Sequence, residues 1–414
     1  MKKIVQAWTG ISLVQRIVAG LVIGALLGMF VPSEGGIAIL GDVFVGALKA
    51  IAPLLVFFLV ISSLCYAGKS HGGVIRTVII MYMFSTFLAA IVAVTASSAF
   101  PVTLTLVDAA TDMAAPQGVA EVLRTLLMNV VTNPVQSLVS ANYIGILVWA
   151  VLIGIALRKA SDTTKQSLND ISAALSKTVT WIIQCAPFGI MGLVYNTVSV
   201  NGLSTFTEYG KLLAVLLGSM LFIYFVTNPI LVFWCIRKNP YPLIFKCLKK
   251  SAITAFFTRS SAANIPINME ACAEMGLDKD TYSVTIPLGA TINMDGAAIT
   301  ITVMTLAAAH TLGIAVDIPS AIILSILATL SACGASGVAG GSLLLIPMAC
   351  SLFGISNDIA MQVVGVGFII GVIQDSVETA LNSAGDVEFA ATAEYHQWLK
   401  QGKPLPEFLT GKKN

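Results

Sequence analysis

Long apolar runs separated by short polar connections make up almost the whole chain. A transmembrane helix needs roughly 20 predominantly apolar residues. The first run follows three basic residues, as in a signal peptide, but no small-x-small cleavage motif comes after it. The pattern therefore predicts eight transmembrane helices, the first of them uncleaved. The eight runs lie at about residues 17–31, 41–67, 74–106, 143–157, 171–200, 212–236, 282–312 and 359–393.

Two further apolar segments, 243–273 and 318–353, are interrupted at their middle by small and helix-breaking residues. The interruptions are residues 260–266 (SSAANIP) and 334–341 (GASGVAGG). Each arm has about 10 to 17 residues and reaches roughly 15–25 Å at 1.5 Å per residue. This is short of the ~30 Å hydrocarbon core, so we expect two re-entrant helical hairpins rather than two further spans.

The distribution of charge predicts the orientation in the membrane. Cytoplasmic loops of membrane proteins are enriched in Lys and Arg, and here the basic residues gather in alternate connections and in the C-terminal tail. This bias predicts that both termini are cytoplasmic and that each hairpin returns to its own side. The modestly polar residues 101–142 are expected outside the membrane or as short broken helices.

Composition excludes several classes of protein. Of the 414 residues, 57% are hydrophobic and 11% are charged, whereas soluble domains have about 25% charged residues. With a mean hydropathy of +0.88, no polar stretch is long enough to form a soluble domain beside one anchor. A formal net charge of +2 argues against a nucleic-acid-binding surface. The compact chain, without a long loop of the glycosylated kind, is typical of a bacterial inner-membrane protein.

Polar side chains concentrate on the last span, at offsets of 0, 3, 4, 7 and 11 residues. At about 100° per residue these positions fall within about 100° of one another, so they form one polar stripe on an apolar helix. Ionisable residues within a span are costly and usually functional, and two or three carboxylates exceed what packing requires. The stripe consists of Asp375, Glu378, Thr379, Asn382 and Asp386.

A second candidate site lies in the run 282–312, where Asn293-Met294-Asp295-Gly296 interrupts an apolar helix. Asn, Asp and Gly have low helix propensity, so we expect local unwinding that frees backbone carbonyls. Carbonyl and carboxylate oxygens suit a hard cation. A kinked helix whose Asp bonds a neighbour is the simpler alternative.

The hairpin tips offer a third kind of site. At the first tip, Ser260 and Ser261 precede a half-helix whose free N–H groups and positive dipole end would attract a carboxylate, although such serines often serve helix packing. The glycine-rich second tip suits either close packing or a hinged gate. A hairpin followed by a polar helix occurs twice in succession. This arrangement is typical of secondary transporters built from inverted repeats, whose discontinuous elements meet near the midplane.

Three strings in these segments resemble the dicarboxylate/amino acid:cation symporters, the family that includes the glutamate transporters. They are residues 258–266 (TRSSAANIP), 287–296 (PLGATINMDG) and 375–386 (DSVETALNSAGD). The similarity extends over nearly the whole chain and is greatest to the members that couple sodium to serine and threonine uptake. The resemblance implies sodium-coupled symport of small neutral hydroxyl amino acids, with sodium as the co-transported ion and no enzymatic activity.

The resemblance also implies roles for particular residues. Asp375 would bind the substrate ammonium, and Asn382 together with the backbone around both tips would hold the α-carboxylate. The implied substrate-binding residues are Ser260, Ser261, Val338, Asp375, Glu378, Thr379 and Asn382. Three sodium sites are implied. The first consists of Gly289, Asn293, Asn382 and Asp386, and the second of backbone oxygens near Thr291, Ala332, Cys333 and Ala335. The third consists of Tyr82, Ser85, Thr86, Asn293 and Asp295.

The same family pattern implies a homotrimer that works as an elevator. Residues 1–240 would form mainly the scaffold and the trimer contacts, except that the third and sixth helices belong to the moving part. Residues 241–395, the succession of hairpin, helix, hairpin and helix, would form the core transport domain. Residues 396–414 would form a cytoplasmic tail.

The chain departs from the acid-transporting members at two positions. Those members have Arg where this chain has Glu378, and Thr where it has Ala297. A guanidinium would bind a side-chain carboxylate in a bidentate pair, whereas Glu378 would repel it, so aspartate and glutamate are poor candidate substrates. Arg259 at the first tip is expected to neutralise Glu378 or Asp375, since unpaired buried charges are unfavourable.

Three alternatives stay open from the residues alone. The substrate could be alanine or a dicarboxylate, and the oxygen-rich site could conduct ions as a channel. Residues 334–337 (GASG) also match the GxSG pattern of intramembrane serine proteases. Such a serine needs a histidine base, and no histidine follows it within a membrane run, so symport is the preferred hypothesis.

Overall fold

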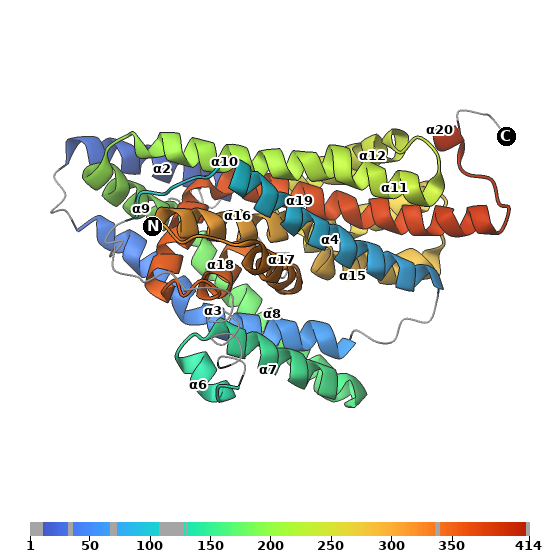
Figure 1. Ribbon diagram of the computed structural model, residues 1–414, viewed down its shortest axis with the longest axis horizontal. Helices are drawn as coiled ribbons and strands as arrows, with labels where there is room; N and C mark the ends of the chain where they lie inside the picture. Colours follow the sequence, from blue (N-terminus) through green and yellow to red (C-terminus); the bar gives the residue numbers. More distant parts are fainter. Residues whose placement is uncertain are drawn as a thin grey trace.

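The computed structural model describes residues 11–31, 36–66, 73–106, 128, 131–335 and 340–410. Every regular element in these segments is helical, in agreement with the expected all-α class (Figure 1). Val338, the GxSG serine and most of the 101–142 connection lie outside the described residues, so the predictions made for them have no structural counterpart here.

Six helical stretches in the described part of the chain are long and apolar enough to cross a bilayer. A seventh is obtained if the bent pair α8 (Asp162–Gln184) and α9 (Ala186–Asn201) counts as one span. The six are α2 (Leu13–Phe30), α3 (Ala38–Tyr66), α4 (Gly73–Ala99), α10 with η2 and α11 (Thr205–Phe222, Ile223–Thr227 and Asn228–Ile236), α15 with α16 (Lys279–Ile292 and Asp295–Thr311), and α19 (Asn357–Lys400).

The predicted count of eight spans is therefore met for six or seven of them. The run 143–157 forms α7 (Tyr143–Ala156), whose 14 residues extend only about 21 Å at 1.5 Å per residue. The run 171–200 is bent by 55° between α8 and α9. Pro187 lies in the first turn of α9 and lacks the N–H that would continue the hydrogen bonds of α8.

The helices pack in two groups. Helix α3 packs against α7, α8 and α9, and α2 packs against α9. Helices α4, α10 and α16 pack instead against α19 and one another. In Figure 1, α10, α11 and α19 run along the upper part of the view, whereas α7 and α8 lie at the bottom. Three short helices belong neither to the spans nor to the two hairpins described below: α6 (Pro134–Val139), η1 (Leu157–Lys159) and α20 (Glu407–Thr410).

Close backbone contact between α2 and α9 depends on glycine. A Cβ atom at Gly20 would lie 2.2 Å from the carbonyl oxygen of Pro187, and one at Gly24 would lie 2.4 Å from that of Met191. Small residues allow such approach between membrane helices, where van der Waals packing replaces the hydrophobic driving force. Gly20 and Gly24 therefore allow α2 to approach α9 this closely.

Replacing Gly24 with valine is expected to lower the thermal stability of the purified protein, because overpacking costs about 1–3 kcal/mol. Gly46→Ala in α3 is the matched control, since nothing lies within 4 Å of its Cβ position. A melting curve for each variant checks the prediction. Equal melting temperatures for the two variants would contradict the packing argument.

The first hairpin breaks slightly earlier than predicted. Its first arm is α12, η3 and α13 (Tyr241–Cys247, Leu248–Ala252 and Ile253–Thr258) and its second arm is α14 (Ser261–Glu274). The predicted break over 260–266 is met only at Ser260, because the helix is interrupted at Arg259, with φ of 53°, and at the N-cap Ser260, whereas 261–266 are helical. Pro266 lies inside α14, where its ring removes one i→i−4 hydrogen bond.

A buried amide cluster holds α14 in place despite this proline. Asn264 Nδ2 donates to Ser383 Oγ at 2.8 Å and lies 3.1 Å from Ser251 Oγ. Asn268 Nδ2 donates to the carbonyl of Ser383 at 3.0 Å. These contacts join both arms of the first hairpin to α19, and they place its tip beside the stripe.

The second hairpin is interrupted where the sequence predicts. Its first arm is α17 (Ile318–Ala332), and its second arm consists of η4 (Ser342–Leu345) and α18 (Ile346–Ser351). The described residues between the arms are 333–335 and 340–341. The arms of the first hairpin pack against α19 and α15, and those of the second pack against α16 and α19.

Candidate functional site

The polar stripe of α19 faces the interior, as its periodicity predicts. All five of its side chains are buried, from 0% exposed for Asp386 to 6% for Thr379. Thr379 Oγ1 donates to the carbonyl of Asp375 at 2.7 Å, within the helix. The other four side chains make contacts with the hairpins, α15 and α16.

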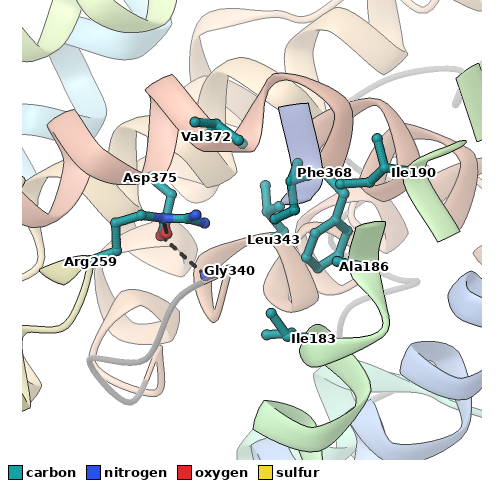
Figure 2. Close-up of a pocket in the computed structure, with 11 residues that line it drawn as sticks. Ile183, Ala186, Ile190, Arg259, Gly340, Leu343, Phe368, Val372 and Asp375 are labelled. Carbon is teal, nitrogen blue, oxygen red and sulfur yellow. Dashed lines mark hydrogen bonds and ion pairs between the residues drawn. The ribbon is translucent and has the colours of Figure 1, made fainter. Parts of the chain in front are cut away.

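Asp375 is held by both hairpins. Arg259 Nε donates to its Oδ2 at 2.6 Å, and the backbone N–H of Gly340 donates to its Oδ1 at 3.1 Å (Figure 2). Arg259 and Asp375 are both buried. Of the two partners considered for Arg259, the structure thus selects Asp375. Asp375 therefore binds an arginine at the position where a substrate ammonium is expected.

A small cavity lies beside this ion pair, as Figure 2 shows. Its volume is about 10 Å³, which is room for roughly one water molecule. An amino acid would fit only after Arg259 or a hairpin tip moves. The cavity is lined by Ile17, Ile183, Ala186 and Ile190 from α2, α8 and α9, and by Arg259, Gly340, Leu343, Phe368, Gly371, Val372 and Asp375 from the two hairpins and α19.

Glu378 lies outside this cavity and is satisfied by protein donors. Its Oε2 accepts from Thr300 Oγ1 at 2.7 Å, from Ser342 Oγ at 2.9 Å and from Gln374 Nε2 at 2.5 Å. The sequence reasoning missed these three partners. Gln374 could have been found from its position four residues before Glu378, whereas Thr300 and Ser342 come from other segments and give no local signal.

The interrupted helix is broken at Asn293 and Met294, between α15 and α16, so the predicted unwinding occurs. Gly296, expected to permit it, is itself helical. Asn293 Nδ2 donates to Asp386 Oδ1 at 3.0 Å and to the carbonyl of Asn382 at 3.0 Å. Asn382 Oδ1 in turn accepts from the backbone N–H of Gly296 at 2.7 Å.

Within the part of the chain that the structure describes, two fully buried oxygens of this cluster have no hydrogen-bond partner: Asn293 Oδ1 and Asp386 Oδ2. Unsatisfied buried acceptors are unfavourable unless a cation binds them. Gly289 provides the space, because a Cβ atom there would lie 2.6 Å from Asp386 Oδ1 and 2.9 Å from the hydroxyl oxygen of Tyr82. The donor set of one carboxylate, one amide and nearby carbonyls fits a hard cation.

A second oxygen cluster surrounds Asp295. Ser85 Oγ donates to its Oδ2 at 2.6 Å, and Thr86 Oγ1 lies 3.0 Å from its Oδ1. The hydroxyl of Tyr82 donates to the carbonyl of Asp386 at 2.9 Å, which links this cluster to the first one. The structure therefore brings together Tyr82, Ser85, Thr86, Asn293 and Asp295, all fully buried.

The other predicted positions lie around the hairpin tips. Cys333 Sγ lies 3.8 Å from the carbonyl oxygen of Ile292, so the end of α17, with Ala332 and Ala335, approaches the end of α15 near Thr291. Ser260 Oγ accepts from the N–H of Ala263 at 3.2 Å as the cap of α14. Ser261 follows it and is buried.

Among the residues that the structure describes, no group of three or more His, Cys, Asp and Glu side chains is placed to hold a metal ion. The two clusters described above consist instead of one carboxylate each with amide, hydroxyl and carbonyl oxygens.

A multi-pass helical bundle with buried carboxylates between two interrupted helical hairpins defines a membrane transporter. The chain matches the Sodium:dicarboxylate symporter family over residues 13–395 and belongs to that family. The family resemblance noted from the sequence is thus confirmed, and the protein is a transporter rather than an enzyme. This assignment excludes the alternative of an intramembrane serine protease.

The chain is similar over its full length to proteins named serine/threonine transporter SstT. It is 58% identical to the protein of Bifidobacterium adolescentis over 414 residues, covering 100% of this chain and 96% of that one. It is 57% identical to the protein of Streptococcus thermophilus over 401 residues (97% and 100% covered). It is also 57% identical to that of Streptococcus agalactiae over 395 residues (95% and 98% covered).

Proposed function

We propose that the protein couples sodium entry to the uptake of serine and threonine across the bacterial inner membrane. The names of its full-length relatives support this substrate class. The observation on which the coupling rests is the buried cage around Asp386 and Asn293, where two oxygens lack any partner. Alanine and dicarboxylates are weaker candidates, the latter because the carboxylate of Glu378, within the stripe, would repel a second carboxylate.

In the proposed binding mode, the substrate ammonium replaces Arg259 at Asp375. The exchange does not change the net charge at Asp375, because one cation leaves the carboxylate as another binds it. No unpaired charge is therefore left at Asp375. Asn382 and Thr379 would lie near the α-carboxylate. The backbone of the first tip, at Ser260 and Ser261, and that of the second tip around Val338 would donate to it.

Sodium is proposed at the three sites expected from the family pattern. The cage of Gly289, Asn293, Asn382 and Asp386 is supported by its unpartnered oxygens. The Asp295 site is supported by the convergence of Ser85 and Thr86 on that carboxylate. The site near Thr291 would use backbone oxygens where the end of α17 approaches α15.

The proposed architecture has eight spans, with α7 as the fourth, and two re-entrant hairpins in an inverted repeat. Both termini would be cytoplasmic. The chain would assemble as a homotrimer around α2, α3 and α7–α9, with residues 241–395 moving as an elevator. The packing of α4 and α10 against α16 and α19 supports assigning the third and sixth helices to the moving part.

Uptake into proteoliposomes tests the function. Serine and threonine should accumulate against their gradient when sodium is higher outside, and counterflow without a sodium gradient should rank serine, threonine, alanine and aspartate. Serine accumulation that is the same with and without sodium would overturn the proposed coupling. Saturable uptake also separates symport from channel conduction.

Gly289→Ala is expected to raise the sodium concentration for half-maximal uptake by about tenfold, equivalent to about 1.4 kcal/mol. The added methyl group would occupy the space beside Asp386 Oδ1. Gly210→Ala in α10 is the matched control, because nothing lies within 4 Å of its Cβ position. Sodium activation curves measured at saturating serine check the prediction. A normal curve for Gly289→Ala would contradict a cation in this cage.

A further inference from the structure

Glu388 is a buried acid with no close hydrogen-bond donor among the described residues. It lies on α19 and is fully buried, and neither of its carboxylate oxygens accepts a hydrogen bond of ordinary length in that part of the chain. Glu378, on the same helix, accepts from three donors. A buried carboxylate without donors is strongly unfavourable as an anion unless a cation binds it. The function proposed above does not use this side chain.

The neighbours of Glu388 supply further oxygen atoms. The fully buried amide of Asn228, from α11, lies beside the Glu388 carboxylate, and Asp295 is close enough for the two acids to repel each other. Asn228 Nδ2 is a distant donor toward that carboxylate and makes no close hydrogen bond to any residue that the structure describes. Two fully buried side chains from different helices therefore face each other, and Glu388 has no donor close enough to stabilise its anion.

Ser85 connects this place to the Asp295 cluster. Its hydroxyl lies 2.6 Å from Asp295 Oδ2 and 3.3 Å from Asn228 Oδ1. A hydroxyl has one proton, and Ser85 donates it to Asp295, which is the nearer of the two acceptors. Ser85 Oγ and Asn228 Oδ1 therefore face each other without a proton between them. Two oxygens that bind one cation at about 2.3–2.6 Å and at right angles lie roughly 3.3–3.7 Å apart.

The excess of buried carboxylates over buried basic side chains also favours a cation at Glu388. Of the buried carboxylates along α16 and α19 that the structure describes, Asp375 alone has a basic partner within 4 Å. The three sodium sites proposed from the family pattern include Asp295 and Asp386 and leave Glu388 without a cation. The buried carboxylates of α16 and α19 are Asp295, Asp375, Glu378, Asp386, Glu388 and Glu394.

We propose that Glu388, Asn228 and Ser85 form an additional sodium site, which shares Ser85 with the adjacent Asp295 site and is not among the three sites that the family pattern implies. The proposal rests on cation coupling by the same bundle, since sodium must be able to reach these helices. The ion would neutralise Glu388 and reduce its repulsion with Asp295. It would bind between α4, α11 and α19.

Equilibrium binding of radioactive sodium to the purified protein in lipid nanodiscs tests the site. With saturating serine, Glu388→Gln is expected to bind one sodium fewer per chain than the unmodified protein. Gln keeps the shape and removes a buried charge, so the variant should fold. Glu394→Gln is the matched control on the same helix, because that carboxylate accepts from the N–H of Asp278 at 2.9 Å and should leave the sodium number unchanged.

Asn228→Ala provides a second variant, which retains Glu388 and should weaken the affinity for one sodium by about tenfold. Equal numbers of bound sodium ions in Glu388→Gln and the unmodified protein would overturn the site. This is also the result expected if Glu388 binds only a proton. Absence of sodium binding in the unmodified protein would instead overturn the proposed function. Loss of one sodium in Glu388→Gln alone, with uptake retained, supports the additional site.

Discussion

Replacing Asp375 with asparagine is expected to reduce serine uptake by about a hundredfold or more. Removing one partner of a buried ion pair costs about 3–5 kcal/mol, and the asparagine amide offers the substrate ammonium no counter-charge. In the structure, Asp375 is buried and paired with Arg259 at 2.6 Å. Uptake of radioactive serine into proteoliposomes measures the effect.

The same substitution leaves Arg259 buried without its partner, so folding needs a separate check. The double variant Arg259→Met/Asp375→Asn removes both charges and should melt at a higher temperature than Asp375→Asn alone, while its uptake stays low. Asp358→Asn is the matched control, since that exposed carboxylate lies at the start of the same helix. Unchanged serine affinity in Asp375→Asn would show that the ammonium binds elsewhere.

Spans were predictable because the bilayer imposes one strong requirement on composition. An apolar run of sufficient length forms a helix, since every backbone polar group must be satisfied within the segment. The break between α15 and α16 was also predictable. Asn293 and Asp295 have low helix propensity, and polar residues within a membrane span are energetically unfavourable and usually functional. The exact break of the first hairpin was not, because Pro266 is accommodated by the contacts of Asn264 and Asn268 with α19.

The candidate site was predictable where it depends on one helix. The spacing of Asp375 and Asp386 is enough to place them on one face of the helix. Glu388 lies about 80° beyond the edge of that stripe and was overlooked although it is ionisable. The choice of Asp375 as the partner of Arg259 depends on how the first hairpin docks. These residues are 116 positions apart, and no local pattern specifies their distance.

The buried acid Glu378 should determine which amino acids are excluded. Thr300, Ser342 and Gln374 donate to it, and these three hydrogen bonds offset part of the cost of burying a charge there. An acidic substrate bound at Asp375 would bring a second carboxylate toward it. Two like charges about 5 Å apart repel by roughly 3 kcal/mol at an effective dielectric of about 20. A neutral hydroxyl amino acid avoids this repulsion.

Glu378→Gln is therefore expected to reduce the preference for serine over aspartate by about tenfold or more, which corresponds to about 1.4 kcal/mol of that repulsion. Glutamine is chosen because it keeps the shape of the Glu378 side chain and removes only its charge. Competition of unlabelled aspartate with radioactive serine measures the ratio, with Glu394→Gln as the control on the same helix. If the unmodified protein already binds aspartate as tightly as serine, the charge of Glu378 does not set the selectivity.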